Sequence, residues 1–517
     1  MAFYNAAVDL IDRNLPQRRS HPAFIDERGT LTYGALAEGV GRTAGALRAL
    51  GLEPESRIAL VMLDTNEFPL AFLGAIKAGI VPIPLNTLFP ASDYAFILSD
   101  SRAKAVIVSV ELLPKVLEAA GSAGWAGEVI VSDPAGTGDA RGYRRFDALV
   151  AAATPLADAF PTRPDDPCFW LYSSGSTGRP KGAVHVQTSM VQTADLFARA
   201  ILDFNADDVV FSAAKLFFAY GLGNALSFPL TVGATSVLFA GRVTPDLVCD
   251  VLAAHKPTVF CAVPTLFSAL LLHPGLPKQG AHSLRLCTSA GEVLPEAIGS
   301  AWTTQTGVEI IDGIGSTEML HIFVSNRPGD VRYGTTGKPV PGYRARVMDE
   351  HGASVKTGEI GELEIAGPTA AAHYWNNLEK SRRTFVGEWT RTGDKFYVDD
   401  EGYYHHCGRA DDMLKVSGIW VSPSEVESAL TSHDDVVECA VIGVADEHEL
   451  IKPKAFVVLK PGAAGDENVL KAHVKSLLAP YKYPRWIEFV AELPKTPTGK
   501  IQRHVLRERE ASPSARP

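Results

Sequence analysis

The chain has 517 residues, of which 46% are hydrophobic and 21% charged, and its formal net charge at pH 7 is −10. Such a chain can form several globular domains with a large buried core, and its acidic balance speaks against nucleic-acid binding, which usually needs a basic face. The 6 cysteines form no CxxC pair, and the N-terminal segment contains no apolar signal region. We therefore expect a cytoplasmic protein with reduced cysteines and with neither nucleic acid nor a membrane as partner.

Helical and strand patterns alternate through the first third of the chain. Residues 32–50 predict an amphipathic helix that ends at Gly51, with an apolar face made of Leu36, Val40, Ala44 and Leu47. Short apolar runs follow as RIALVML, IVPIPL and AKAVIVS, and similar runs return later as TSVLFA, PTVFCAV, LRLCTSAG and VEIIDGIG. Continuous apolar strands between amphipathic helices are typical of a buried, largely parallel sheet.

The stretch between Lys215 and Arg242 carries no charge and is long enough to cross a bilayer. It also contains Asn224, Pro229 and Gly233, and it has the pattern of a helix, a turn and the strand TSVLFA. We interpret it as a buried element of the protein core rather than as a membrane span.

The pattern of residue types changes twice in the last third of the sequence. From about residue 332, glycine-punctuated, alternating segments such as GELEIAG and GYYHHCG predict a β-rich subdomain. Polar and glycine residues then crowd together at 408–418, and residues 422–425 have the form of a capping box with proline at the first helical position. The strands and helix that follow predict a compact α+β unit of about a hundred residues, a normal size for a separate domain.

The segment YSSGSTGRPKG, residues 172–182, has the composition of a phosphate-binding loop. Its glycines permit close backbone approach, its hydroxyl and N–H groups donate hydrogen bonds, and Lys181 adds positive charge. It is not a Walker A loop, because Pro180 and Gly182 replace the second glycine and the Ser/Thr of that motif, and GAVHV then predicts a strand where a helix is needed. Taken alone, the segment is also compatible with a solvated hairpin turn.

The same loop resembles the signature loop of the adenylate-forming enzymes, the superfamily of acyl-CoA synthetases, peptide-synthetase adenylation domains and beetle luciferase. Four further motifs of that superfamily follow in order: GIGSTEM at 313–319, TRTGDK at 390–395, GRADDMLKVSG at 408–418 and PKTPTGKIQR at 494–503. The resemblance covers nearly the whole chain. Segments such as FSAAKLFFAYGLGNALSFPLTVGAT and APYKYPRW are similar, more specifically, to those of the benzoate-CoA and 4-hydroxybenzoate-CoA ligases.

The resemblance implies an α/β fold in two parts. A large N-terminal AMP-binding domain over 1–409 would contain two α/β sheets, a β-rich subdomain and the acid pocket, and a small α+β C-terminal domain over 410–517 would be mobile. Asp411 matches the hinge about which the small domain rotates between two half-reactions. The small domain would carry the catalytic Lys500, which reaches the carboxylate and the α-phosphate. It would also carry part of a coenzyme A tunnel formed by Lys415, Ser417, Gly418 and Trp420.

For the nucleotide, the resemblance implies roles position by position. The loop residues that would hold the β- and γ-phosphates of ATP are Ser173, Ser174, Gly175, Ser176, Thr177, Gly178 and Lys181. Thr317 would contact the α-phosphate and Glu318 a Mg²⁺ ion, since a carboxylate beside a triphosphate suits a hard cation. Asp394 and Arg409 would hold the ribose. The adenine would be lined by Ser289, Ala290, Gly291, Glu292, Asp312 and Gly313. Outside these motifs, a capping carboxylate at 318 and a surface ion pair at 394 and 409 would be the alternatives.

An acid pocket matching that of the benzoate ligases is implied at Phe218, Ala219, Tyr220, Gly315, His321 and Ile322. A flat aromatic ring suits a pocket walled by tyrosine and isoleucine in which alanine leaves room. Phe218 occupies the gate position where many relatives carry histidine, so no general base is available there. The sequence does not decide whether His321 bonds a para-hydroxyl group or only packs against the ring.

The implied function is that of an ATP- and Mg²⁺-dependent aryl-CoA ligase, an acid–thiol ligase with an aryl-adenylate intermediate. It would convert benzoate, 4-hydroxybenzoate or both to the coenzyme A thioester and release AMP and pyrophosphate. One alternative is a carrier-protein-loading adenylation enzyme, against which the segments KVSGIW and YKYPRW favour the CoA ligase. Another is a P-loop ATPase, which would release ADP. A monomer and a homodimer are both compatible with the sequence.

Overall fold

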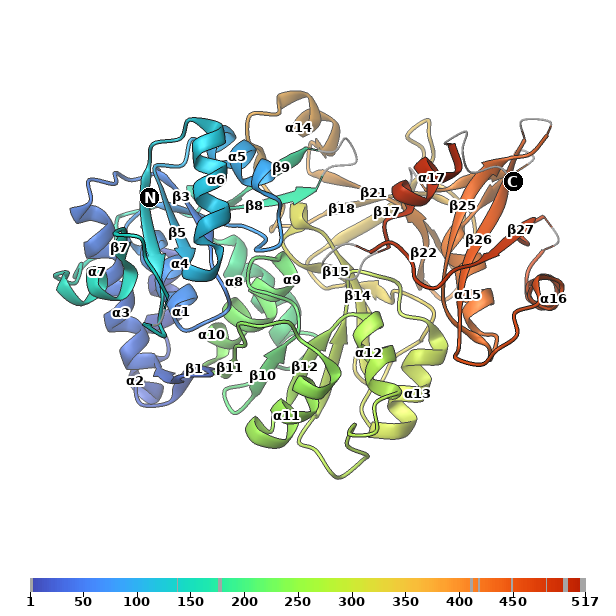
Figure 1. Cartoon of the computed structure of the whole chain (residues 1–517), viewed down its shortest axis with the longest axis horizontal. Coiled ribbons are helices and arrows are strands. Elements are labelled where there is room, and N and C mark those ends of the chain that lie inside the picture. Colours follow the sequence, from blue (N-terminus) through green and yellow to red (C-terminus); the bar gives the residue numbers. More distant parts are fainter. Residues whose placement is uncertain are drawn as a thin grey trace.

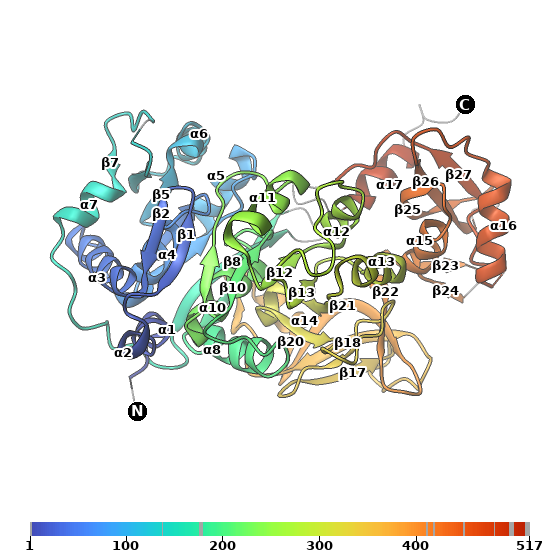
Figure 2. The ribbon, with the colours of Figure 1, turned by 90° about the horizontal axis from the view of Figure 1, so that it is seen from below.

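The computed structural model describes residues 3–136, 138–174, 179–409, 412–416, 419–447, 450–479, 481–495 and 501–511. Figure 1 shows the N-terminal and central sheets with their helices at one side, the β-rich region beside them, and the C-terminal elements at the far side. Figure 2, turned by 90°, agrees that the C-terminal elements form a lobe at one end of an elongated molecule. All 6 cysteines are free, and all but Cys249 are buried, as expected for core residues.

The first sheet confirms the parallel arrangement predicted from the apolar runs. Its strands lie in the order β4-β3-β5-β6-β7, and every adjacent pair is parallel. The helix predicted over 32–50 is α3 (Tyr33–Ala49); Thr32 caps it, and its apolar face is buried as expected. The other elements here are β3 (Arg57–Val61), α4 (Glu67–Lys77), β4 (Val81–Pro84), α5 (Ala91–Asp100), β5 (Ala105–Ser109), α6 (Leu113–Ala123), β6 (Glu128–Ser132), β7 (Arg144–Arg145) and α7 (Phe146–Ala152).

The second sheet has nine strands in the order β16-β15-β14-β13-β12-β10-β11-β1-β2. Neighbours from β14 to β1 are parallel, whereas β2, β15 and β16 pair antiparallel at the edges. The strands are β1 (Pro22–Asp26), β2 (Gly29–Thr32), β10 (Val209–Ser212), β11 (Thr235–Val237), β12 (Val259–Ala262), β13 (Leu286–Ser289), β14 (Ile310–Gly315), β15 (Ile322–Ser325) and β16 (Lys338–Pro339). The accompanying helices are α1 (Ala6–Asp12), α2 (Leu15–Arg18), α8 (Ser189–Thr193), α11 (Pro245–His255), α12 (Pro264–Leu271) and α13 (Glu296–Thr306). Open parallel sheets bind ligands beyond the carboxyl ends of their strands, which here are the ends of β13 and β14.

The uncharged stretch folds as a buried part of this core, as predicted. It forms α9 (Ala219–Leu222), a π-helical turn over Gly223–Ser227, α10 (Phe228–Val232) and then β11. Every residue from 221 to 231 is buried. Within the described ranges, no helix has the length and hydropathy needed to cross a membrane.

A β-hairpin and the predicted β-rich region lie beside these sheets. The hairpin pairs β8 (Pro167–Ser174) with β9 (Pro180–Val186), and β19 (His373–Tyr374) pairs with the other edge of β9. The β-rich region contains β17 (Arg344–Met348), β18 (Gly361–Ala366), α14 (Leu378–Thr384), β20 (Phe385–Val386), β21 (Trp389–Val398) and β22 (Tyr404–Arg409). On β22, His405 contacts Asp399 and His406 contacts Asp394, so the two rings do not converge on one ion.

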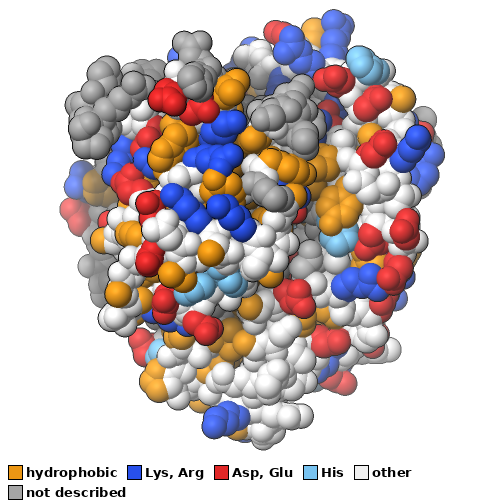
Figure 3. All heavy atoms as spheres, turned by 90° about the vertical axis from the view of Figure 1, so that its right-hand side faces the viewer, with side chains coloured by type: hydrophobic (Ala, Val, Ile, Leu, Met, Phe, Trp, Pro, Cys, Tyr) orange, Lys and Arg blue, Asp and Glu red, His pale blue; other side chains and the backbone are white. Residues whose placement is uncertain are grey.

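The C-terminal lobe pairs β25 with β26 antiparallel and β26 with β27 parallel. Its elements are β23 (Leu414–Val416), β24 (Ile419–Val421), α15 (Pro423–Thr431), β25 (Val436–Ala445), β26 (Ile451–Leu459), α16 (Glu467–Leu477), β27 (Trp486–Phe489) and α17 (Arg503–Ala511). Ser422 Oγ accepts the Glu425 N–H at 3.2 Å, as in the predicted capping box, whereas the Glu425 carboxylate pairs with Lys482. Figure 3 views the molecule from this end and shows basic and acidic side chains interspersed over the surface.

Candidate active site

The phosphate-loop hairpin places Lys181 directly opposite Ser173 on two antiparallel strands. The element after the loop is the strand β9, so the helix that a Walker A loop requires is absent from this position. The Ser173 hydroxyl is buried and has no hydrogen-bond partner among the described residues. The predicted loop residues Gly175, Ser176, Thr177 and Gly178, and the side chain of Ser174, lie outside the described residues.

Glu318, the predicted Mg²⁺ ligand, contacts the predicted phosphate-loop lysine. It lies in a 3₁₀ turn, η4 (Thr317–Met319), between β14 and β15. Its Oε1 accepts hydrogen bonds from Lys181 Nζ at 3.0 Å and from the Tyr374 hydroxyl at 2.6 Å. The same hydroxyl accepts a bond from Lys181 Nζ at 2.7 Å. Burial alone would raise the pKa of Glu318, but the Lys181 charge and these hydrogen bonds hold it below its usual value.

His185 anchors the same turn through the backbone. It follows Lys181 by four residues on β9, so both side chains leave the same face of the strand. His185 Nε2 donates to the Thr317 carbonyl at 2.9 Å, and its ring stacks on Phe169 with 5.1 Å between centroids. Burial lowers the pKa of His185 to about 4, so the ring is neutral at pH 7. Thr317 and Glu318 therefore both accept hydrogen bonds from side chains of β9.

The predicted ribose pair lies together in the β-rich region. Asp394 on β21 is the registered neighbour of Arg409 on β22, and Arg409 Nη1 lies 3.2 Å from both Asp394 carboxylate oxygens. His406 Nε2 lies 3.4 Å from Asp394 Oδ1. An ionised carboxylate only accepts hydrogen bonds, which suits it to a pair of sugar hydroxyls.

The residues predicted to line the adenine lie at the carboxyl ends of two adjacent strands. They are Ser289, Ala290, Gly291 and Glu292 at the end of β13, and Asp312 and Gly313 near the end of β14. Ser289 and Asp312 are paired across the parallel strands, and both are buried. Burial raises the pKa of Asp312 well above its usual value. The structure therefore brings this predicted set together at the carboxyl ends of the strands, which is where open parallel sheets bind ligands.

The predicted acid pocket joins α9 to the β14–β15 hairpin. Phe218 precedes α9, and Ala219 and Tyr220 begin it. Gly315 ends β14, Ile322 begins β15, and His321 is the residue just before β15. The Tyr220 hydroxyl bonds Thr288 Oγ1 at 2.7 Å, which orients its ring. Only glycine fits at 315, because a Cβ atom there would lie 2.5 Å from the His321 carbonyl oxygen.

His321 is buried among aromatic rings and is held by the backbone. Its Nε2 donates to the Tyr220 carbonyl at 3.3 Å, and its ring centroid lies 4.5 Å from Phe228, 5.4 Å from Tyr220 and 5.6 Å from Phe197. Burial lowers the pKa of His321 to about 3. Because the neutral ring donates from Nε2, Nδ1 is an acceptor, and it has no hydrogen-bond partner among the described residues. His321 therefore packs against aromatic rings, donates one hydrogen bond to the backbone, and has Nδ1 left as a buried acceptor.

The oxygen donors of the site suit Mg²⁺. Within the described part of the chain, no group of three or more His, Cys, Asp or Glu side chains could hold a metal by itself. A Mg²⁺ ion that arrives with ATP keeps phosphate oxygens and waters in its shell and needs only one or two protein carboxylates. Glu318, beside Lys181, is a carboxylate whose position fits this requirement.

Comparison with known protein families shows which family the chain belongs to. The model of the AMP-binding enzyme family matches residues 11–375, and that of the AMP-binding enzyme C-terminal domain matches residues 425–500. The chain belongs to the AMP-binding enzyme family. The resemblance to adenylate-forming enzymes predicted from five ordered motifs is thereby confirmed.

Several relatives resemble the chain over nearly its whole length. The benzoate–CoA ligase of Thauera aromatica is 58% identical, covering 98% of this chain and 96% of its own. The 4-hydroxybenzoate–CoA/benzoate–CoA ligase of Rhodopseudomonas palustris is 50% identical, covering 98% and 94%. The solved structure of a benzoate CoA ligase from Burkholderia xenovorans LB400 is 53% identical and superimposes with a TM-score of 0.91 over 98% of this chain and 100% of the other. The predicted α/β fold class is confirmed by this likeness.

Several residues of the C-terminal prediction lie outside the described residues of this family member. They are Asp411, Ser417, Gly418 and Lys500, together with the side chains of Lys415 and Trp420. The backbone of β23 and β24 sets position 415 opposite position 420. A β-bridge pairs Lys495 with Ile501, the described residues on either side of 496–500, and Arg503 bonds Glu427 at 2.7 Å.

Sequence reasoning missed His185, Tyr374 and Gly223. The alternation of β9 could have indicated that His185 shares a face with Lys181. Nothing in the sequence links Tyr374 to Lys181, because they are 193 residues apart and meet only through the pairing of β19 with β9. Gly223 lies against His321, and a Cβ atom there would lie 2.4 Å from its ring.

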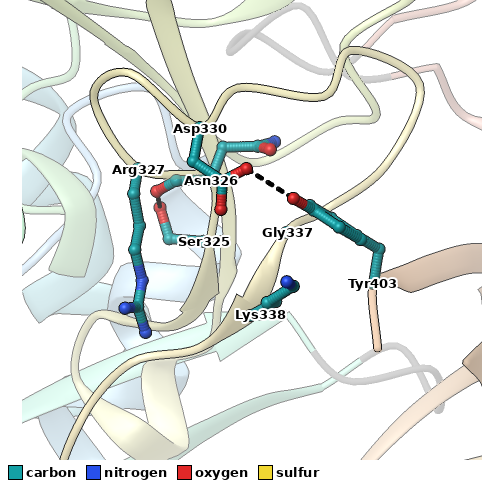
Figure 4. Close-up of a pocket in the computed structure, with 7 residues that line it drawn as sticks. All are labelled: Ser325, Asn326, Arg327, Asp330, Gly337, Lys338 and Tyr403. Carbon is teal, nitrogen blue, oxygen red and sulfur yellow. Dashed lines mark hydrogen bonds between the residues drawn. The ribbon is translucent and has the colours of Figure 1, made fainter. Parts of the chain in front are cut away.

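A small surface pocket backs onto the end of β14. It is lined by Ser325, Asn326, Arg327, Asp330, Gly337, Lys338 and Tyr403. The Asn326 N–H donates to the Asp312 carbonyl at 2.9 Å, so this lining residue lies directly beside β14. Figure 4 shows Tyr403 bonded to Asp330, while Arg327 and Lys338 point in different directions. The two cations therefore do not converge on a common ligand.

Proposed function

We propose that this protein is an AMP-forming aryl-CoA ligase that acts on benzoate. It would convert benzoate, ATP and CoA into benzoyl-CoA, AMP and pyrophosphate through a benzoyl-adenylate. The observation that carries the proposal is that one continuous segment, 313–322, would serve both substrates. Thr317 and Glu318 would face the nucleotide, and His321 and Ile322 would face the acid. Two relatives that are similar over nearly the full chain are named as ligases that act on benzoate.

The first half-reaction would transfer AMP to the acid. A carboxylate is a poor electrophile, so one of its oxygens attacks the α-phosphorus of ATP, the bond to pyrophosphate breaks, and pyrophosphate leaves with the electron pair. The charge that moves would be met by Lys181 at the β- and γ-phosphates, Thr317 at the α-phosphate, and Lys500 between the carboxylate and the α-phosphate. Mg²⁺ bound at Glu318 would neutralise phosphate charge.

The second half-reaction would transfer the acyl group to CoA. The CoA sulfur attacks the acyl carbon, the bond to the AMP oxygen breaks, and the thiol proton is released. We assign this step to a second orientation of the segment 410–517 relative to 1–409, reached by rotation at Asp411. That rotation would withdraw Lys500 and bring Gly418 to the tunnel, where a side chain would block the passage.

The aromatic surroundings of the pocket support an aryl acid. Tyr220, with its hydroxyl held by Thr288, would supply an aromatic wall, and the buried Ile322 would supply an aliphatic one. A specific observation also favours 4-hydroxybenzoate as a second substrate. The buried Nδ1 of His321 is an acceptor to which a para-hydroxyl could donate.

The products formed from a panel of acids test this proposal. The purified chain is incubated with ATP, Mg²⁺, CoA and benzoate, 4-hydroxybenzoate, 2-aminobenzoate, cyclohexanecarboxylate or a short fatty acid. Equal amounts of AMP and aryl-CoA, formed only when an aromatic acid is present, are expected. Formation of ADP, or preference for the fatty acid, would contradict the proposal.

A further inference from the structure

Tyr374 closes a triangle of hydrogen bonds between Lys181 and Glu318. Its hydroxyl donates to Glu318 Oε1 at 2.6 Å and accepts from Lys181 Nζ at 2.7 Å, while Lys181 Nζ donates to the same Oε1 at 3.0 Å. Lys181 Nζ also lies 4.3 Å from the centroid of the Tyr374 ring. The three side chains come from β9, η4 and β19, so the triangle ties together three segments far apart in the chain.

The backbone around Tyr374 holds its hydroxyl at this point. Tyr374 pairs with Ala183 on β9, the residue midway between Lys181 and His185 on the same face. Its N–H donates to Ser381 Oγ at 3.0 Å, and its ring packs on Phe385 with 5.3 Å between centroids. The residue is buried. A hydroxyl fixed in this way can hold a carboxylate in one orientation at little further entropic cost.

The hydrogen bonds of Tyr374 are divided between the two groups that MgATP would use. When phosphate oxygens take over Lys181, the carboxylate of Glu318 loses one of the two donors on Oε1. The Tyr374 hydroxyl can remain on Oε1, because its own position does not depend on Lys181, and the Mg²⁺ that would arrive with ATP would replace the Lys181 charge beside Glu318. A carboxylate held by a charge-assisted hydrogen bond from a fixed donor presents its remaining lone pairs in a defined direction.

We propose that Tyr374 is a positioning residue for the Mg²⁺-binding carboxylate: its hydroxyl fixes Glu318 and keeps it in place while Lys181 moves from Glu318 to the phosphates of ATP. This inference rests on the proposed function. It assigns Tyr374 a role in the Mg²⁺-dependent part of nucleotide binding and none in transfer of the acyl group to CoA.

Tyr374→Phe tests the inference because it removes the hydroxyl and retains the ring that packs on Phe385. Tyr343→Phe is the matched control. Tyr343 is also buried, and its hydroxyl bonds Thr369 Oγ1 at 2.8 Å; Thr369 in turn donates to the Met319 carbonyl of the same η4 turn. The control therefore removes a buried hydroxyl near the turn without touching Lys181 or Glu318.

Calorimetric titration of ATP with and without Mg²⁺, in the absence of any acid, supplies a readout independent of turnover. We expect Mg²⁺ to raise the affinity of the unaltered chain for ATP. Tyr374→Phe should reduce this gain in affinity by about tenfold, because the variant loses one charge-assisted hydrogen bond to Glu318. Tyr343→Phe should keep the full gain. In turnover, Tyr374→Phe should need more Mg²⁺ for adenylate formation and should convert supplied benzoyl-AMP to benzoyl-CoA at the normal rate.

An undiminished Mg²⁺ gain in Tyr374→Phe would overturn the inference, and so would an equal loss in Tyr343→Phe. Failure of this inference can be distinguished from failure of the proposed function. Failure of the unaltered chain to form AMP and benzoyl-CoA would remove the proposed function, whereas the inference is decided by the difference between the two variants.

Discussion

His321 donates its Nε2 proton to the Tyr220 carbonyl across 3.3 Å, and this bond joins the residue before β15 to α9 within the proposed acid pocket. The bond selects one tautomer, with the proton on Nε2 and a lone pair on Nδ1. Burial keeps that ring neutral, since the pKa of His321 falls to about 3. His321 therefore cannot be the cation that meets the carboxylate of the substrate, which leaves that role to Lys500 in the proposed mechanism.

The protonation of buried histidines gives a direct check on the pocket. The ring signals of His321 and His185 in NMR spectra should stay those of neutral imidazole at pH 5, because burial lowers their pKa values to about 3 and about 4. The signals can be assigned with His321→Gln and His185→Gln. Titration of His321 near pH 6.5 would contradict the buried position of its ring.

The same shifts predict how stability depends on pH. Both folded-state values lie below the ordinary value of 6.5, so as pH falls below 6.5 the unfolded chain binds protons that the folded chain does not. The stability from these residues is present above pH 6.5 and is lost as pH falls towards about 4 for His185 and about 3 for His321. The thermal midpoint should fall less steeply over this window in His185→Gln. An unchanged slope would contradict the prediction.

Gly223→Ala should disturb the acid pocket while leaving the nucleotide site intact. The added Cβ would lie 2.4 Å from His321 Cδ2, and the ring cannot retreat freely because Phe197, Tyr220 and Phe228 surround it. Overpacking of this kind costs about 1 to 3 kcal/mol. We expect about a tenfold higher KM for benzoate and an unchanged KM for ATP. Gly121→Ala is the control, since a Cβ there meets no atom within 4 Å; equal effects of the two variants would argue against the assignment.

Lys181 and Glu318 should be energetically coupled in the nucleotide-free chain. Both side chains are largely buried, at 19% and 14% exposure, so Lys181→Met alone leaves a carboxylate without its cation. The double variant Lys181→Met/Glu318→Gln should be more stable than Lys181→Met. A double-mutant cycle from urea unfolding should give a coupling of about 2 kcal/mol. Additive effects of the two changes would show that the pair is not coupled.

Lys500→Ala should separate the two half-reactions. Because Lys500 is assigned to adenylation alone, the variant should lose benzoyl-AMP formation and still convert supplied benzoyl-AMP to benzoyl-CoA. Lys495→Ala is a matched control in the same basic segment; Lys495 pairs with Glu438 at 2.6 Å and has no assigned catalytic role. Loss of both half-reactions in Lys500→Ala would contradict the assignment.

Much of the fold and part of the site could be predicted from local patterns. The apolar periodicity of 32–50 located α3, the strand after the loop excluded the Walker class, and the motif order placed Asp394 beside Arg409. The contacts of Tyr374 with Lys181 and Glu318 could not be predicted, because they depend on the pairing of β19 with β9. The orientation of His321 likewise depends on rings brought from distant segments and on the missing side chain at Gly223.

The central claim is that the carboxylate of an aromatic acid attacks the α-phosphorus of ATP. The most direct measurement uses benzoate labelled with ¹⁸O in both carboxylate oxygens and follows the label by mass spectrometry after one turnover with ATP and CoA. The account predicts one ¹⁸O atom in AMP and one in benzoyl-CoA, because the attacking oxygen stays on phosphorus when CoA displaces AMP. Label in inorganic phosphate together with ADP, or AMP without label, would contradict it.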